Sequence, residues 1–272
     1  MNINFSKAEA AGNDFIILDN RSNKLFGAGL NFSDFAKYSC KRKYSVGADG
    51  VLILEKSDKA DMKMRILNPD GSEVAMCGNG IRCSAYYAYQ KGWCVSSMRI
   101  ETLSGILEAN VSGNSVKIKM PLPKDIKLNQ NLGVGKTIMN IHSINTGVPH
   151  VVHFVEDLKN YPVKESGKNL RHHKMFEPGG TNADFVKVRD KSTIEVRTYE
   201  RGVEDETLAC GTGVVASSLI THLINGIESP IKALTKGGEV LKVYFKKEQK
   251  EIRDVYLEGD SRIAFEGGLD YV

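Results

Sequence analysis

The chain has 272 residues, 41% of them hydrophobic, which is enough for one large domain or for two of ordinary size. Its net charge of +4 comes from 37 basic and 33 acidic residues spread along the sequence, so we expect solvated faces and no nucleic-acid interface. No apolar run approaches the ~18 residues that span a bilayer, and the amino terminus has no signal-peptide core, so we expect a soluble, cytoplasmic protein without membrane contact.

Strand signals alternate with two helical patterns in the first half of the chain. Apolar residues recur at helical spacing over residues 32–43, with Ser33 as a candidate cap, and again over about 81–90. One strand-like run ends at Asn68-Pro69-Asp70-Gly71, which is a strong turn signal. The strand-like runs cover residues 2–5, 13–18, 50–54 and 62–67, and three or four alternating strands follow up to Met120.

The second half repeats this order in a weaker form. Its run at residues 182–188 resembles the run at 13–18, and its run at 194–199 resembles the run at 62–67. We infer an old internal duplication with a boundary at Pro121-Leu122-Pro123. The alternative is a chance resemblance between two strand-turn-helix units.

Two short stretches of the chain are nearly alike. They are Met76-Cys77-Gly78-Asn79-Gly80 and Ala209-Cys210-Gly211-Thr212-Gly213. Each places a cysteine before a Gly-x-Gly turn, and each precedes a helical pattern, the second over about residues 214–225. The two halves of the chain therefore each supply one thiol in a matched setting.

A cysteine at the start of a helix lies where unpaired backbone N–H groups point outward. Those donors and the helix dipole favour negative charge, so such a thiol should ionise more readily than a free one, whose pKa is about 8.5. The same donors can hold a carboxylate. Two such helix ends facing each other would place Cys77 and Cys210 on either side of one α-carbon, which suits a racemase with one thiolate and one thiol. The alternative is two structural cysteines beside turn glycines.

The remaining cysteines and the histidines give weaker signals. Five cysteines without an export signal favour free thiols, and there is no Cys-x-x-Cys motif. His150 and His153 lie in a strand-like run, where residues three apart point to opposite faces, so we expect no metal site there. Three cysteines are expected to be packing residues: Cys40, Cys83 and Cys94.

With these residues in view, the chain resembles the diaminopimelate epimerase family. The matching motifs occur in the family's order and cover nearly the whole chain. They are Gly12 to Phe15, Gly47 to Asp49, Asn68 to Cys83, Asn145 to His150, and Glu200-Arg201-Gly202 running into Ala209 to Gly213.

The resemblance implies a cofactor-independent epimerase that converts LL-2,6-diaminoheptanedioate to the meso form on the way to lysine. It implies an α/β (α+β) fold of two pseudo-symmetric domains, each a curled, mostly antiparallel sheet around a central helix. It also implies a homodimer without a metal. The expected domains are residues 1–121 with a returning strand at about 262–272, and residues 122–261.

The resemblance also assigns roles to individual residues. It makes Cys77 and Cys210 the catalytic acid–base pair, with carboxylate contacts at the two helix starts and a polar shell that recognises the distal amino-acid end. The residues implied to bind substrate are Asn13, Asn68, Gly78, Asn79, His150, Asn182, Glu200, Arg201, Gly211 and Thr212.

Two departures from the family pattern leave some contacts open. Gly50 stands where some members have a glutamine that touches the substrate, and Val148 stands where some have an asparagine. The competing functions are a two-cysteine racemase of proline, hydroxyproline or histidine, a non-catalytic amino-acid-binding protein or thiol sensor, and a zinc-binding protein. Glu200, Arg201 and the asparagines argue against a compact substrate, which has no distal zwitterion to recognise.

Overall fold

The computed structural model describes residues 1–135, 137–249 and 251–271 and divides the chain into two compact units. Unit 1 comprises Met1–Ile118 and Gly259–Val272, and unit 2 comprises Lys119–Glu258. Both boundaries lie a few residues before those expected from the sequence. Val272, which the expected returning strand included, lies outside the described residues.

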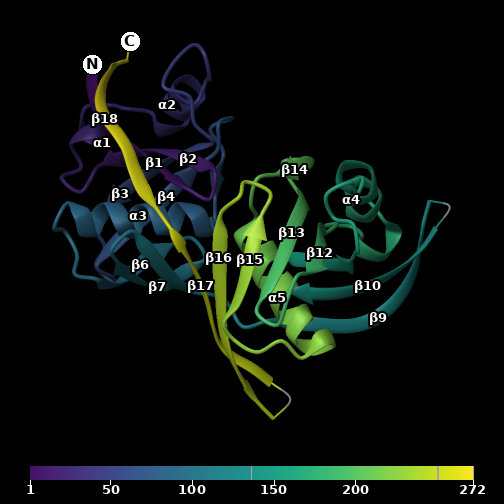
Figure 1. Cartoon of the computed structure of the whole chain (residues 1–272). Helices are drawn as coiled ribbons and strands as arrows, with labels where there is room; N and C mark the ends of the chain where they lie inside the picture. The colour runs from purple at the N-terminus through teal and green to yellow at the C-terminus, as the bar shows by residue number, and fades with distance from the viewer. Residues whose placement is uncertain (136, 250, 272) are drawn as a thin grey trace. The chain divides into compact units, whose positions relative to one another are not determined.

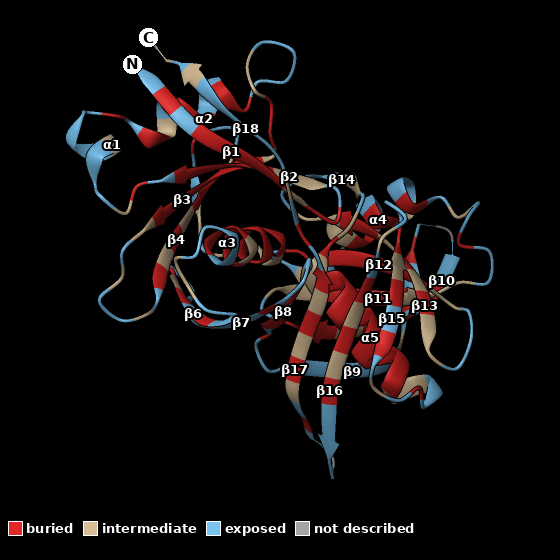
Figure 2. Cartoon of the chain, turned by 60° about the vertical axis from the view of Figure 1, so that its left-hand side comes forward, coloured by how far each residue is buried: buried red, intermediate tan, exposed pale blue. Residues whose placement is uncertain are grey.

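Unit 1 is a mostly antiparallel sheet around one helix. Helix α3 (Gly78–Gln90) is buried along most of its length (Figure 2). The pairing order is β18–β1–β2–β3–β4–β6–β7–β8, with β5 beside β4, and only β2–β3 and β4–β6 are parallel. The strands are β1 (Asn2–Ala10), β2 (Asn13–Asp19), β3 (Gly50–Glu55), β4 (Met62–Leu67), β5 (Glu73–Val74), β6 (Ser97–Thr102), β7 (Gly105–Ser112), β8 (Ser115–Lys119) and β18 (Arg262–Asp270).

Strands β2 and β3 are covered on both faces, which explains their continuous apolar runs. Helices α1 (Lys24–Gly27) and α2 (Phe32–Ser39) connect them, and Phe35 of α2 packs into the same core as Ile16 and Val51. Helix α2 ends four residues before the expected limit. Its cap is Asn31, whose Oδ1 accepts from the backbone N–H groups of residues 33 and 34, so the expectation that Ser33 caps the helix is wrong.

Unit 2 has the same arrangement around α5 (Gly211–Asn225), whose apolar residues face all directions and are buried (Figure 2). The pairing order is β9–β10–β11–β12–β13–β15–β16–β17, with β14 beside β13, and only β11–β12 and β13–β15 are parallel. The strands are β9 (Lys124–Val134), β10 (Thr137–Asn145), β11 (Pro149–Phe154), β12 (Asn182–Val188), β13 (Thr193–Glu200), β14 (Asp205–Thr207), β15 (Ile231–Thr235), β16 (Val240–Glu248) and β17 (Glu251–Asp260). Helix α4 (Val163–Arg171) and a 3₁₀ turn (Lys174–Phe176) connect β11 to β12.

The shared pairing order corrects one internal alignment made from the sequence. β12 pairs parallel with the strand before it and antiparallel with β13, as β3 does with β2 and β4. The run at residues 182–188 therefore corresponds to β3 and not to the run at 13–18, whose counterpart is β11. The two runs look alike because each carries Asn and Asp before Phe at the start of a buried strand.

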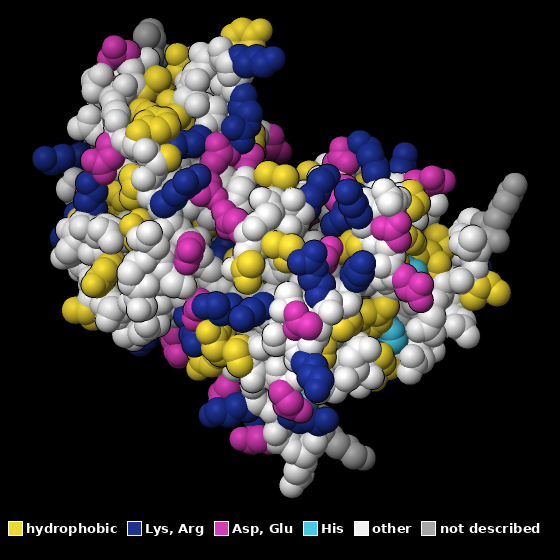
Figure 3. All heavy atoms as spheres, viewed as in Figure 1, with side chains coloured by type: hydrophobic (Ala, Val, Ile, Leu, Met, Phe, Trp, Pro, Cys, Tyr) yellow, Lys and Arg dark blue, Asp and Glu magenta, His cyan; other side chains and the backbone are white. Residues whose placement is uncertain are grey.

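The two ends of the chain meet in unit 1, where β1 and β18 lie side by side as antiparallel partners from Asn2 and Asp270 onward (Figure 1). On the face drawn in Figure 3, basic and acidic side chains are interspersed. Ion pairs are frequent in the structure, and one example is Arg65 with Glu73 at 2.7 Å.

Candidate functional site

Cys77 and Cys210 are the N-cap residues of the two buried helices. Both have extended backbone angles. The first intrahelical bonds run from Ile81 N to Cys77 O and from Val214 N to Cys210 O, each at 2.9 Å. The N–H groups of residues 78–80 and 211–213 therefore precede the helical ladder and are the donors that could hold an anion.

Both helices begin three residues earlier than the sequence pattern predicted. The two Gly-x-Gly segments are thus first turns of helices and not turns that precede them. Gly80 is closely packed, because a Cβ there would lie 3.1 Å from Leu52 Cδ2 and the leucine side chain would have to shift slightly. The glycines let each cysteine sit directly at a helix end that is buried against its own sheet.

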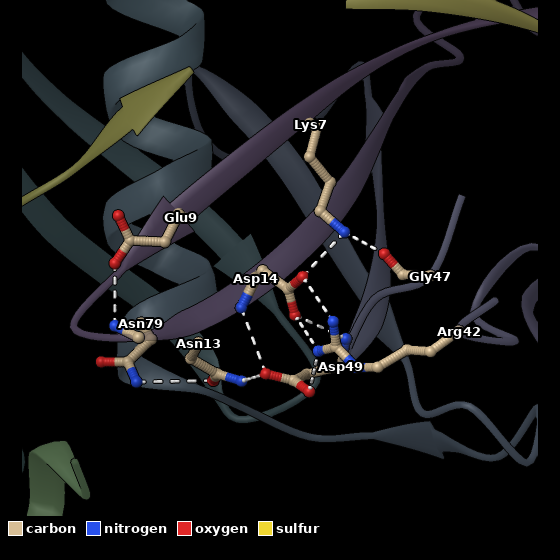
Figure 4. Close-up of polar contacts among 9 residues, drawn as sticks. Lys7, Glu9, Asn13, Asp14, Arg42, Gly47, Asp49 and Asn79 are labelled. Atoms are coloured by element: carbon tan, nitrogen blue, oxygen red, sulfur yellow. Dashed lines mark hydrogen bonds and ion pairs between the residues drawn. The ribbon is translucent and has the colours of Figure 1, made fainter. Parts of the chain in front are cut away.

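In unit 1, the predicted residues Asn13 and Asn79 lie next to Cys77 (Figure 4 shows the two asparagines). Asn13 is the first residue of β2, and its Oδ1 lies 3.8 Å from Cys77 Sγ and 3.4 Å from Asn79 Nδ2. Asn68 follows β4 and donates to Ser72 Oγ at 3.1 Å, within the turn that leads to Cys77. Gly78 is the first residue of α3.

The structure gives a reason for the departure at Gly50. A Cβ on this residue would lie 2.8 Å from the carbonyl oxygen of Leu67 on the adjacent strand β4. The approach of the backbone therefore excludes a glutamine here without a shift of the strand.

In unit 2, a series of side chains in contact with one another leads from Cys210 into the core. Cys210 Sγ lies 3.4 Å from Thr212 Oγ1, which lies 2.9 Å from His150 Nε2. His150 Nδ1 lies 2.7 Å from Asp184 Oδ2, and Thr198 donates to the other carboxylate oxygen at 2.7 Å. The carboxylate can only accept at Nδ1, so Nε2 is the ring nitrogen that can accept from the Thr212 hydroxyl.

Asp184 and Thr198 are residues that the sequence reasoning missed. Asp184 is completely buried, and a Cβ on Gly213 would lie 2.3 Å from its Oδ1, so the second glycine of the motif makes room for this carboxylate. The available signal was an aspartate inside an otherwise apolar strand run, at residues 182–188.

The other predicted residues of unit 2 surround these side chains. Asn182 is buried, contacts His150 Nε2 at 3.4 Å through Nδ2, and accepts from Arg201 N–H at 2.7 Å. The Arg201 guanidinium donates to Gly179 O at 3.3 Å. Gly211 opens α5, and Thr146 Oγ1 anchors the helix start by donating to Thr212 O at 3.0 Å.

Burial dominates the electrostatics of this group. It raises the pKa of Cys210 well above its ordinary value, and the charges of Glu200 and Asp184 add to this, against hydrogen bonds from Thr212 and the Gly213 N–H. The expectation that a helix start lowers the pKa is therefore wrong for Cys210, since desolvation outweighs the dipole. Burial also raises the pKa of Glu200. At neutral pH Cys210 is a thiol, the form that donates a proton.

Within the described ranges, no group of three or more His, Cys, Asp or Glu side chains is placed to hold a metal ion, and no helix is long and apolar enough to cross a membrane. All five cysteines are free thiols, as predicted, and Cys40 and Cys83 are buried.

Comparisons with known proteins agree with the motifs. The model of the family "Diaminopimelate epimerase" matches residues 5–123 and 142–263. The diaminopimelate epimerase of Aquifex aeolicus is 40% identical over 274 residues, covering 97% of each chain. That of Archaeoglobus fulgidus is 39% identical over 282 residues, covering 99% of this chain and 97% of the relative.

Two solved structures show the same fold. A phenazine biosynthesis protein of the PhzF family from Bacillus anthracis superposes with a TM-score of 0.77 at 18% identity, covering 100% of both chains. A hydroxyproline epimerase from Agrobacterium vitis superposes with a TM-score of 0.70 at 14% identity, covering 98% of this chain and 92% of the other.

Proposed function

We propose that this chain, which belongs to the diaminopimelate epimerase family, is an isomerase that converts LL-2,6-diaminoheptanedioate to the meso form in lysine biosynthesis. The observation that carries the proposal is the placement of Cys77 and Cys210 as N-caps of two buried, topologically equivalent helices. We also propose that it works as a cytoplasmic homodimer, without a cofactor or metal.

The proposed mechanism uses the two sulfurs as opposed acid and base. The thiolate of one cysteine takes the α-proton, which breaks the C–H bond and leaves the electron pair on carbon. The thiol of the other cysteine delivers its proton to the opposite face. The configuration is inverted, and thiolate and thiol have exchanged places, so the pair titrates as one coupled unit. The raised pKa of Cys210 favours its thiol form, which is the form that delivers a proton.

Main-chain donors supply the electrostatic part of this mechanism. Loss of the α-proton pushes negative charge onto the adjacent carboxylate, which we place at the N–H groups of residues 78–80 and 211–213. Fixed donors need no reorganisation as the charge grows, which makes such groups a large contribution to catalysis. The helix dipoles add in the same direction.

The polar shell is proposed to select the substrate by its distal end. The Arg201 guanidinium would bind the distal carboxylate, and the Glu200 carboxylate would accept from the distal ammonium. The Asn68 amide could accept from the ammonium or donate to the carboxylate. Asn182 supports the shape of this shell, because its Oδ1 accepts from the Arg201 N–H. His150 would act at the reacting centre through its contact with Thr212.

The test is a stereochemical assay of the reduced protein. Incubation with the LL isomer should yield the meso form, and in D₂O the meso product of the first turnover should carry deuterium at one α-carbon only. Cys77→Ala and Cys210→Ala should each lower kcat about 1,000-fold or more, since a two-base reaction has no substitute for either sulfur. L-proline is the matched compact substrate and should not be racemised.

Two results would overturn the proposal. A folded, reduced enzyme that forms no meso product would exclude the activity. Substantial turnover by either alanine variant would exclude the two-thiol mechanism while leaving the activity in place.

A further inference from the structure

The side-chain amide of Asn13 lies between Cys77 and a cluster of charged residues, with one end toward each. Its Nδ2 donates to Asp49 Oδ2 at 2.7 Å, and its Oδ1 lies 3.8 Å from Cys77 Sγ (Figure 4 shows Asn13 beside Asp49). The two ends of an asparagine amide are chemically different, so its orientation decides whether Cys77 faces an acceptor or a donor.

Charged residues at both ends fix that orientation. The Asp49 carboxylate only accepts, so the NH₂ of Asn13 must face it. At the other end, Arg82 only donates and gives a 2.7 Å hydrogen bond to Asn79 Oδ1, which turns the Asn79 NH₂ toward Asn13 Oδ1 at 3.4 Å. Flipping either amide would set donor against donor or acceptor against acceptor.

Asp49 is itself held firmly. Its Oδ1 accepts from Arg42 Nη2 at 2.8 Å, and its Oδ2 accepts from the backbone N–H of Asp14 at 3.2 Å. Arg42 also pairs with the Asp14 carboxylate at 2.6 Å, and Lys7 pairs with it at 2.8 Å. The charged groups around Asn13 are thus Lys7, Glu9, Asp14, Arg42, Asp49 and Arg82 (Figure 4 shows all but Arg82).

We propose that Asp49 is a positioning residue for the acid–base chemistry of Cys77, acting through the amide of Asn13. This inference rests on the proposed function. The amide presents an oxygen to the sulfur, which directs the S–H when Cys77 is protonated. When Cys77 is a thiolate, the same oxygen offers it no hydrogen bond, so the sulfur remains a strong base toward a weakly acidic α-proton.

The variant that tests this is Asp49→Asn, which keeps the shape and changes the donor pattern. Arg42 at one end and the backbone N–H of Asp14 at the other would compete for the single oxygen of the new amide. The charged guanidinium makes the stronger hydrogen bond, so we expect it to take the oxygen and leave the NH₂ toward Asn13. Asn13 would then turn over and direct its own NH₂ at Cys77. A donor stabilises the thiolate, so we expect the pKa of Cys77 to fall by about one unit. We also expect kcat/KM to fall about tenfold or more, as for other losses of an orienting partner.

The pKa of Cys77 can be measured without turnover, from the pH dependence of its alkylation by iodoacetamide, assigned to the Cys77 peptide by mass spectrometry. An unchanged or raised pKa in Asp49→Asn would overturn the inference. Failure of the wild-type enzyme to epimerise would instead overturn the proposed function and leave the alkylation result standing, so the two failures are distinguishable.

Asp14→Asn is the matched control. It removes one carboxylate from the same cluster, but no side-chain hydrogen bond of Asp14 reaches Asn13 among the described residues. Its effect on the pKa of Cys77 should be less than about a third of that of Asp49→Asn, and kcat/KM should stay within about threefold. Equal shifts in both variants would mean that net charge alone acts, and would overturn the inference.

A double-mutant cycle isolates the amide. In an Asn13→Ala background, Asp49→Asn should no longer shift the pKa of Cys77, because the connecting group is gone. A shift of the same size there would contradict the inference.

Asn13→Ala alone leaves the charge cluster intact and is the variant to use if Asp49→Asn does not fold. It removes the oxygen from the sulfur, so the pKa of Cys77 should fall, and an unchanged value would again overturn the inference.

Discussion

The ionised carboxylate of Asp14 is expected to stabilise the fold. Burial alone would raise its pKa, but the hydrogen bonds and charges of Arg42 and Lys7 outweigh that effect and lower the pKa from 3.8 to about 2. A carboxylate with a lowered pKa stabilises the fold above its unfolded-state pKa, and this contribution is lost as the pH falls toward the folded value.

We therefore expect Asp14→Asn to lower the free energy of unfolding by about 2 kcal/mol at pH 7. The difference from wild type should shrink between pH 4 and pH 2, where the wild-type carboxyl takes up its proton. Urea denaturation at several pH values measures this. Asp34→Asn, which removes an exposed pair with Lys37, is the control and should cost little. A difference independent of pH would contradict the ionic explanation.

Among the helices, α4 shows a conflict between local preference and packing. Gly167 lies in its interior, where alanine would favour the helix by about 1 kcal/mol. A Cβ there, however, would lie 2.3 Å from Cβ of Tyr199, which is buried on β13. Overpacking of this kind costs about 1–3 kcal/mol, so packing should decide whether an alanine at this position stabilises or destabilises the protein.

We expect Gly167→Ala to lower the unfolding free energy by about 1 kcal/mol or more, measured by thermal or urea denaturation. Gly27→Ala is the control, because it is also helical and its Cβ would meet nothing within 4 Å. That variant should be neutral or slightly more stable. Stabilisation by Gly167→Ala would show that α4 moves away from β13 at little cost.

These elements also show what the sequence could predict. The duplicated Cys-Gly-x-Gly blocks predicted two equivalent helices with a thiol at each, because that signal is local. The three-residue error at each helix start arose because apolar periodicity begins only after the first turn. Asp49 and Asp184 were missed because their importance depends on partners about 35 residues away, Asn13 and His150, which only strand pairing brings close.

At the scale of the whole molecule, unit 1 is assembled from both ends of the chain. Strand β18 pairs with β1 over most of its length, and the side chain of Asn2 donates to Asp270 Oδ1 at 2.8 Å. Without β18, the N–H and C=O groups of one edge of β1 would lose their partners. Unit 2 comprises the continuous segment Lys119–Glu258.

Deleting residues 262–272 should therefore destabilise unit 1 selectively. We expect amide protection in β1 to fall about 100-fold or more in hydrogen exchange, while β12 and β13 keep theirs, because each unit has a hydrophobic cluster of its own. The matched internal change is Gly268→Val, whose Cβ would lie 2.8 Å from Asn2 Oδ1 and should weaken the same pairing to a smaller extent. An equal loss of protection in both units would mean that they unfold together, and that the returning strand stabilises the chain as a whole.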